Sequence, residues 1–294
     1  MRLGLSIIVC QFLAVTVFAV LQFITARPEQ SAGTFWGAAA GSVIFCGAAL
    51  YFLGKPWRLE ILELSLLLAM FTFMGSLVWS AIAQYLAGKP GGITILRAVL
   101  GALSFQGATL ALVPRFLRQH EIGWSEAFGL TINRKTSLLF GALGALIFLP
   151  VGWGLQLVSS DAISRMGWKP ELQPAVQVLV NADVWQSRVI LGLVTIGLAP
   201  VAEETLFRGI LYPAVKRLGY PRAALWTVSL LFALVHFNPP TFLPLFVMAV
   251  MLTRLYDSTG NLLGPIMLHC LFNAANFLWF YFGHYLPPWV PFHP

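Results

Sequence analysis

Long apolar runs follow one another along this chain, and most of the charged residues lie in the shorter segments between them. A helix needs about 20 mostly apolar residues to cross a bilayer, and only helices or closed barrels satisfy their backbone hydrogen bonds within lipid. The pattern therefore predicts an all-α fold, a polytopic transmembrane helical bundle of about eight or nine spans. The predicted spans are residues 3–25, 34–53, 62–86, 93–113, 137–157, 189–215, 223–237, 241–256 and 262–282.

Two of these runs, 223–237 and 241–256, are shorter than the others and are separated by prolines. Pro239 and Pro240 lie between them, and Pro244 follows just inside the second run. Short and proline-interrupted spans are typical of helices that break within a membrane protein, often beside a functional site. We therefore expect these two spans to be short or broken.

The composition excludes an ordinary soluble protein, since 58% of the 294 residues are hydrophobic and only 10% are charged. The net charge of +7 would suit nucleic acid on a soluble domain. In a membrane protein, Lys and Arg instead concentrate on cytoplasmic loops. Counting them predicts a cytoplasmic N-terminus and an outer C-terminus. The lipid bilayer is therefore the expected partner, and nucleic acid is not.

Three charged residues interrupt the run 189–215, namely Glu203, Glu204 and Arg208. Charges at such depth cost several kcal/mol each unless they are paired or used. Glu204 and Arg208 have the i,i+4 spacing of a salt bridge, whereas Glu203 lies about 140° around the helix from Arg208. We interpret Glu204 and Arg208 as a supporting pair and Glu203 as the reactive group. Pro200 is predicted to break the helix, which would place both glutamates in a fresh first turn.

Two later spans carry further polar residues in the patterns F-x-x-x-H, Phe232 to His236, and H-x-x-x-N, His269 to Asn273. The outer residues of each pattern share one face of a helix. At 1.5 Å of rise per residue, Glu203, His236 and Asn273 lie about 20, 21 and 18 Å from the predicted cytoplasmic ends of their helices. Polar groups from three helices are thus expected in one layer.

This set of residues suits peptide hydrolysis without a covalent intermediate. A glutamate beside an imidazole activates water as a general base, and a second histidine with an asparagine amide stabilises a developing oxyanion. Two alternatives use the same residues differently. One is a non-catalytic membrane protein, such as an immunity or scaffold protein that uses them for packing, and the other is a transporter with an acidic site at mid-membrane.

Other protease chemistries fit the sequence less well. It contains no H-E-x-x-H, no G-x-S-G and no G-x-G-D motif, which argues against a zinc site on one helix, a serine nucleophile and an aspartyl dyad. Zinc remains an alternative through a different set, because Glu203, His236 and His269 would form two imidazole ligands and one carboxylate. The sequence does not distinguish metal-bound water from carboxylate-activated water.

The three motifs, E-E-x-x-x-R at 203–208, F-x-x-x-H at 232–236 and H-x-x-x-N at 269–273, resemble those of the CPBP family. This is the CAAX-protease and bacteriocin-processing group of intramembrane endopeptidases, also called Abi. The resemblance covers about residues 186–282 and implies an all-helical membrane fold. It implies that Glu203 and His236 activate water and that His269 and Asn273 are oxyanion partners. Glu204, Arg208 and Phe232 would be supporting positions.

The resemblance also implies a peptide or protein substrate, and a bacterial inner membrane as the location, since many family members are bacterial. Self-immunity against bacteriocins is a role in the family that fits the non-catalytic alternative. The predicted organisation has four parts. They are N-terminal transmembrane helices (1–158), an outer loop (159–188), a CPBP-like catalytic core (189–282) and a C-terminal tail (283–294).

Overall fold

A computed structural model describes residues 99, 102–180, 182, 184–236 and 238–282. Every regular element among these residues is a helix. Four helices are long and apolar enough to cross a membrane, and Pro221–Leu234 is a shorter apolar helix. The four are Arg134–Arg165, Trp185–Arg217, Pro239–Thr259 and Leu263–Phe282. The predicted all-helical membrane class is thus confirmed for the described part of the chain. The first three predicted spans and most of the first nine residues of the fourth, residues 93–101, lie outside it.

The chain divides into two compact units, Met1–Glu121 and Ile122–Pro294. In the first unit, the structure describes a short π-helix, η1 (Leu103–Gly107), which continues into α5 (Ala108–Gln119). Pro114 lies inside α5 without ending it. The helix therefore extends beyond the predicted limit of residue 113.

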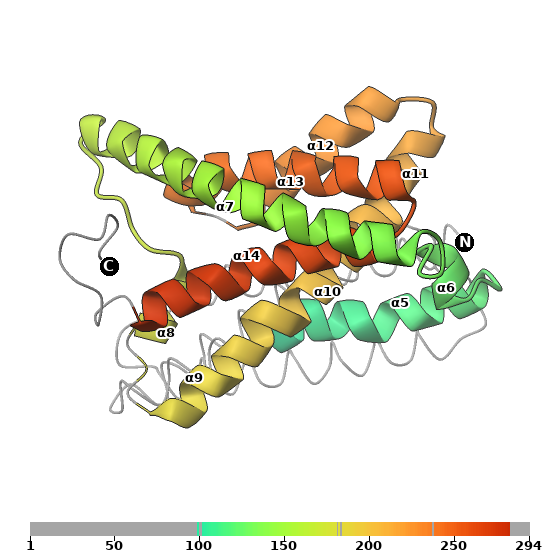
Figure 1. The fold of residues 1–294 in the computed structure, drawn as a ribbon, viewed down its shortest axis with the longest axis horizontal. Coiled ribbons are helices and arrows are strands. Elements are labelled where there is room, and N and C mark those ends of the chain that lie inside the picture. Colours follow the sequence, from blue (N-terminus) through green and yellow to red (C-terminus); the bar gives the residue numbers. More distant parts are fainter. Residues whose placement is uncertain (1–98, 100–101, 181, 183, 237, 283–294) are drawn as a thin grey trace, which may run out of the picture. The chain divides into compact units, whose positions relative to one another are not determined.

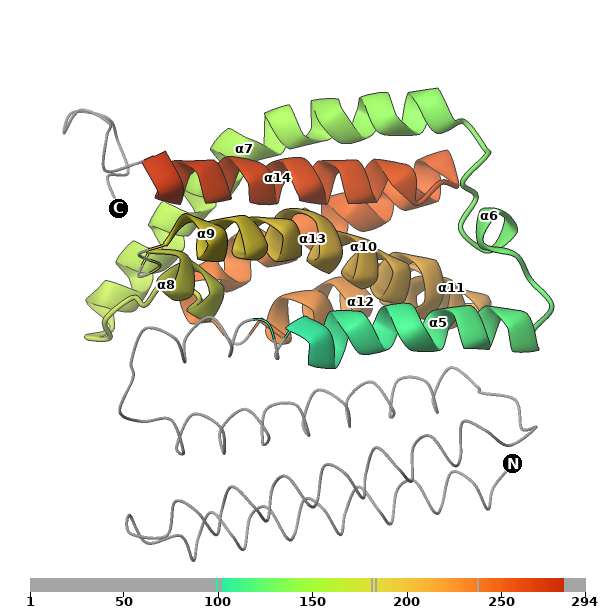
Figure 2. The ribbon, with the colours of Figure 1, turned by 90° about the horizontal axis from the view of Figure 1, so that it is seen from below.

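The second unit contains the site and is built from helices that mostly run alongside one another (Figure 1). Helix α7 packs against α13 and α14, and α12 packs against α13. Figure 2 shows α7 and α14 side by side along much of their length. The elements are α6 (Trp124–Ala127), α7 (Arg134–Arg165), α8 (Pro174–Val180), α9 (Trp185–Gly192), η2 (Leu193–Leu198), α10 (Ala199–Glu204), η3 (Thr205–Leu211), α11 (Tyr212–Arg217), α12 (Pro221–Leu234), α13 (Pro239–Thr259) and α14 (Leu263–Phe282).

Small residues allow α7 and α14 to approach closely. A Cβ atom at Gly141 would lie 2.4 Å from the carbonyl oxygen of Gly264, and one at Gly144 would lie 2.8 Å from Cδ1 of Leu268. Glycine at such positions lets the backbones of membrane helices come together, where dispersion contacts and packing hold them. This contact fixes the place of α14, which carries His269.

The prolines near the start of α13 do not interrupt it. The prediction that the span 241–256 is short or broken is therefore wrong. Helix α13 has 21 residues and includes Pro244. Pro239 and Pro240 occupy the first turn, where a missing N–H costs no intrahelical bond. Pro244 removes only the bond to the carbonyl of residue 240, in that same turn. Asn238 caps the helix by accepting a hydrogen bond from the backbone N–H of Thr241 at 3.2 Å.

Pro200 likewise does not break its helix, contrary to the prediction. Residues Trp185–Arg217 form one helix in which α9, η2, α10, η3 and α11 follow without interruption. The turn before Pro200, η2, is a π-helix. A proline within a helix lacks an N–H and crowds the preceding turn, and a turn with i→i+5 bonding is a common way to absorb such a local change. Glu203 and Glu204 therefore end a turn between two π-helices rather than begin a new helix.

Candidate active site

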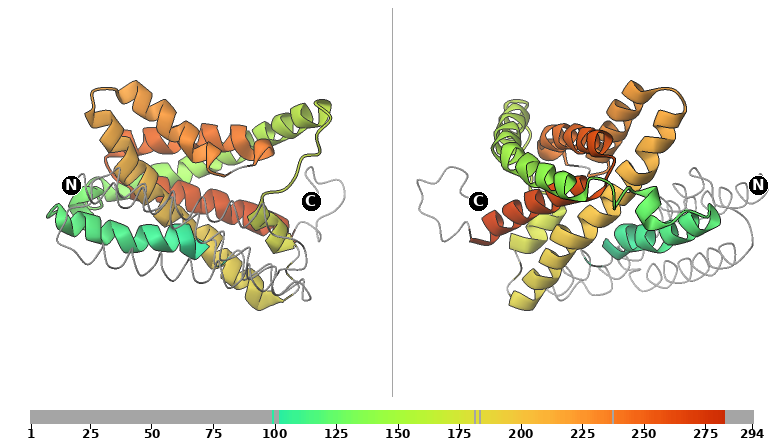
Figure 3. Two further views of the ribbon diagram at one scale, coloured as in Figure 1. Left: turned by 180° about the vertical axis from the view of Figure 1, so that it is seen from behind. Right: turned by 45° about the vertical axis from the view of Figure 1, so that its right-hand side comes forward.

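The predicted site residues come from three regions of the second unit. Glu203 and Glu204 end α10, and Arg208 lies one turn later in η3. His236 lies just beyond α12, and His269 and Asn273 are in α14. Helix α14 contacts both η2 and α10. The two views of Figure 3 show α14, in red, crossing the long helix that contains η2 and α10, in yellow to orange.

Glu204 and Arg208 form the predicted ion pair at the centre of the unit. Arg208 Nη1 donates to Glu204 Oε1 at 2.9 Å, and both side chains are 0% exposed. Arg208 also donates to the Ala249 carbonyl at 3.1 Å and to Thr253 Oγ1 at 3.4 Å, both on α13. Its guanidinium carbon lies 4.5 Å from the centre of the Phe232 ring. A buried pair needs such additional bonds, because its mutual attraction alone rarely offsets the desolvation of both charges.

His269 contacts the same carboxylate oxygen as Arg208 does. Its Nδ1 lies 2.9 Å from Glu204 Oε1, and the His269 side chain is only 3% exposed. Because an ionised carboxylate only accepts, Nδ1 carries the proton in this bond. The contact sets the orientation of the imidazole. It was not predicted, because no spacing rule links two residues on separate helices.

Glu203 faces a different histidine, in a different environment. Its Oε2 lies 3.9 Å from Nε2 of His236, and the two side chains are 11% and 22% exposed, respectively. Nδ1 of His236 lies 2.7 Å from the carbonyl oxygen of Phe232. A carbonyl only accepts, so Nδ1 is protonated, and the Nε2 of a neutral ring presents its lone pair toward Glu203. A polar separation above 3.5 Å is one that a water molecule commonly bridges.

Phe232 lies between the two glutamate–histidine pairs and is fully buried. Its ring centre lies 4.9 Å from that of His236 and 5.8 Å from that of His269. Phe207 packs on it edge to face at 5.2 Å. The first residue of the F-x-x-x-H pattern thus contacts both histidines and the guanidinium of Arg208.

Asn273 is held one turn beyond His269 by a bond that the sequence did not indicate. Its Nδ2 donates to the Thr195 carbonyl in η2 at 2.8 Å. An asparagine amide has two N–H donors, so one of them remains for another acceptor. The bond to Thr195 joins α14 to η2. The π-helical turn before the glutamates therefore positions this amide.

The candidate metal ligands do not form a metal-binding set in this arrangement. Within the part of the chain that the structure describes, no three His, Cys, Asp or Glu side chains are grouped to hold a metal ion. His269 directs Nδ1 to Glu204, whereas Glu203 faces His236. Glu203, His236 and His269 are therefore not grouped as metal ligands among the described residues, and zinc at this site stays a prediction.

Comparison with known proteins identifies the same kind of enzyme family as the motifs do. Residues 185–275 match the family model described as type II CAAX prenyl endopeptidase Rce1-like. The uncharacterized protein YpbD of Bacillus subtilis (strain 168) is 33% identical over 101 residues, which are 33% of this chain and 49% of that relative. The chain thus spans about half the length of the curated relative it matches. No solved structure matches. The predicted resemblance to CAAX proteases is confirmed over residues 185–275.

Proposed function

Because residues 185–275 match a family of type II CAAX prenyl endopeptidases, we propose that this integral membrane protein is an intramembrane endopeptidase. Its nucleophile is a water molecule held between Glu203 and His236. The observation that supports this most is the pair itself, with Glu203 Oε2 and His236 Nε2 separated by 3.9 Å and side chains that are 11% and 22% exposed, respectively. Water commonly bridges polar groups at such a separation. An ionised carboxylate accepts a proton, and so does the Nε2 of a neutral imidazole whose Nδ1 carries the hydrogen.

The proposed reaction uses these groups in two steps. The carboxylate of Glu203, assisted by His236 Nε2, takes a proton from the water as its oxygen attacks the scissile carbonyl carbon. The carbonyl oxygen becomes an oxyanion. The C–N bond then breaks, and the proton taken from water passes to the leaving amine. The products are a carboxylic acid and an amine, and no covalent enzyme intermediate forms.

His269 and Asn273 are the proposed donors to the oxyanion. Glu204 holds Nδ1 of His269 at 2.9 Å, which directs the Nε2 edge of the ring away from that carboxylate. Nε2 is the proposed donor to the oxyanion. Asn273 contributes the N–H that is not bonded to Thr195. Donors that are already oriented stabilise a developing charge without reorganisation during the reaction. Glu204, Arg208 and Phe232 act in this scheme as positioning residues.

The experiment that tests the proposal compares the membrane peptides of cells that express the native chain with those of cells that express Glu203→Gln. We expect peptides that the native chain removes to persist with Glu203→Gln, because the loss of a general base costs about a hundredfold or more in rate. Asp161→Asn is the control, since Asp161 lies in an exposed ion pair with Arg165. Equal cleavage by the native chain and Glu203→Gln would refute the role of Glu203.

Experiments on the purified native chain distinguish activation of water by a carboxylate from activation by a metal ion. We expect a strong chelator to leave cleavage by the purified native chain unchanged, and metal analysis to find less than one zinc per chain. Loss of activity on chelation, with recovery on adding zinc, would instead assign the activation of water to a metal.

A second candidate function is a non-catalytic membrane scaffold or immunity protein. The observation in its favour is the fully buried set of Glu204, Arg208 and His269, which connects η3, α13 and α14. This candidate predicts that Glu203→Gln leaves both the membrane peptides and any protective phenotype unchanged, whereas changes at Glu204 abolish the folded protein.

A further inference from the structure

A cavity of about 410 Å³ opens between α7, α13 and α14, and none of the residues of the candidate site lines it. Its apolar wall consists of Phe140 on α7, Met251 and Leu255 on α13, and Leu268 on α14. Its polar rim consists of Arg254, Asp257 and Ser258, all on α13. The volume is within the range of about 300–1,000 Å³ that is usual for small-molecule sites. A wall of this kind suits a hydrocarbon chain.

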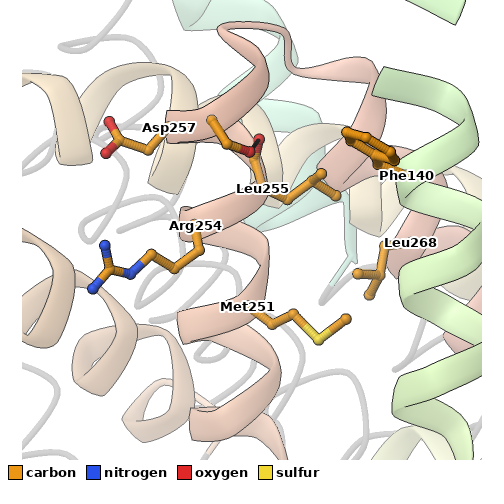
Figure 4. A pocket seen from close by; sticks show the side chains of 7 residues that line it. Phe140, Met251, Arg254, Leu255, Asp257 and Leu268 are labelled. Carbon is orange, nitrogen blue, oxygen red and sulfur yellow. Dashed lines mark hydrogen bonds between the residues drawn. The ribbon is translucent and has the colours of Figure 1, made fainter. Parts of the chain in front are cut away.

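The rim has one positive charge that nothing in the described structure neutralises. Arg254 makes no hydrogen bond or ion pair with any described residue, whereas Asp257 is ion-paired with Lys216. Lys216, Asp257 and Arg254 together therefore have a net charge of +1. Figure 4 shows Arg254 and Asp257 on one side of α13 and Phe140 and Leu268 on the other. The cavity thus has a cationic side and an apolar side.

The cavity lies near one end of a membrane-length helix. Arg254 is five residues before the last residue of α13, Thr259, a distance of about 8 Å along the axis. Lys216 and Arg217 end the long helix near the same place, since Lys216 pairs with Asp257. Lipid phosphates lie just outside the hydrocarbon core, and a long arginine side chain near a helix end can extend toward that level. Arginine matches phosphate geometry, because its planar fork donates two parallel hydrogen bonds.

We propose that this cavity binds one anionic phospholipid, with an acyl chain against Phe140, Met251, Leu255 and Leu268 and the phosphate on Arg254. The net charge of the rim favours a headgroup with a net negative charge over a zwitterionic one, whose cation would lie near Lys216. Leu268, which also lines the cavity, is fully buried and directly precedes His269. The lipid thus lies where α7, α13 and α14 come together. The inference does not depend on the proposed protease activity.

The test uses the full chain in nanodiscs of phosphatidylcholine with increasing fractions of phosphatidylglycerol, and native mass spectrometry to count the lipids retained. We expect the native chain to retain one phosphatidylglycerol, and Arg254→Gln to lower that affinity about tenfold, as the loss of a charge-assisted hydrogen bond does. Arg217→Gln is the matched control, because Arg217 is an exposed cation at the same end that does not line the cavity. We expect it to retain the lipid.

A second variant tests the apolar part of the cavity. Ser258→Phe adds bulk from an exposed position on the rim, and we expect it to lower phosphatidylglycerol retention without unfolding the protein, which thermal unfolding checks. Four results would overturn the proposal. They are equal losses in Arg254→Gln and Arg217→Gln, equal retention of phosphatidylcholine, displacement of the lipid by millimolar inorganic phosphate, and a change of oligomeric mass in Ser258→Phe with unchanged lipid retention.

Discussion

Glu203 and Glu204 are neighbours in the chain, but the structure gives them different surroundings. Glu204 is fully buried and contacts its histidine, His269, at 2.9 Å, with Arg208 on the same oxygen. Glu203 retains some exposure and lies 3.9 Å from His236. Glu204 and His269 form a direct bond, and the bonds of Glu204 and Arg208 join their own helix to α13 and α14. The second pair is too far apart for a direct hydrogen bond, at a separation that a water molecule commonly bridges, and the proposed hydrolysis needs such a water.

The comparison teaches that one buried motif combines a rigid part with a reactive part. The bonds of Arg208 to Ala249 and Thr253 fix α13, and the bond of Glu204 to His269 fixes α14. None of these three bonds involves Glu203. The two pairs are joined through Phe232, whose ring contacts both histidines. Changes in the rigid pair should therefore lower stability, and changes in the open pair should lower activity.

The largest expected effect follows from removing the carboxylate of Glu204, which both Arg208 and His269 contact. Glu204→Ala leaves the buried guanidinium of Arg208 with neutral acceptors only, which should destabilise the fold by about 3–5 kcal/mol. Unfolding in detergent, followed by circular dichroism, measures this. The double variant Glu204→Leu with Arg208→Met removes both charges and should regain a large part of the loss. If Glu204→Ala is as stable as the native protein, the Glu204–Arg208 ion pair does not hold the helices together.

The next effect concerns the open pair. His236→Gln removes the imidazole beside Glu203 and should lower cleavage of a reporter peptide about a hundredfold. His236 is partly exposed, and within the described part of the chain its direct hydrogen bond is to the Phe232 carbonyl. The free energy of unfolding should therefore change by less than about 1 kcal/mol. If cleavage persists while stability falls, the assignment of the two pairs is reversed.

A smaller effect is expected at the residue that the two pairs share. Phe232→Leu keeps an apolar side chain but removes the aromatic face under Arg208 and both histidines. The loss of the cation–π contact should cost about 1–2 kcal/mol. It should also lower cleavage, because both imidazoles lose a packing surface. Phe246→Leu is the control, since Phe246 stacks on Trp226 and Phe242 instead. Equal effects of the two variants would refute a special role for Phe232.

The smallest effect tests whether Asn238, in the turn after His236, helps to position His236 beside Glu203. Asn238 follows His236 by two residues, caps α13 through Thr241, and donates to the Glu171 carbonyl at 3.1 Å. Asn238→Ala should cost about 1 kcal/mol as a lost helix cap. It should lower kcat for the reporter more than it raises KM, because the turn after His236 loosens. Asn238→Asp keeps the cap acceptor but cannot donate to the Glu171 carbonyl, so it should recover only the part of the stability that the cap supplies. An unchanged kcat would mean that His236 is positioned by α12 alone.

The sequence by itself determined the class of the fold and several local features, because these depend on spacing along one chain. The apolar runs predicted helices long enough to span a membrane, and the i,i+4 spacing predicted the Glu204–Arg208 pair, which is present at 2.9 Å. The three motifs predicted the family resemblance that residues 185–275 confirm. The catalytic role of Glu203 remains a prediction.

Only the tertiary structure decided which partners meet across helices. The bonds of His269 to Glu204 and of Asn273 to Thr195 join residues 65 and 78 positions apart, and no periodicity in the sequence encodes them. The prolines were misread for a related reason. The sequence shows that Pro200 and Pro244 lack an N–H, but whether a helix then breaks depends on the neighbouring turn and on the packing around it. Here a π-helix precedes Pro200, and Pro244 lies only one turn into α13, so both helices continue.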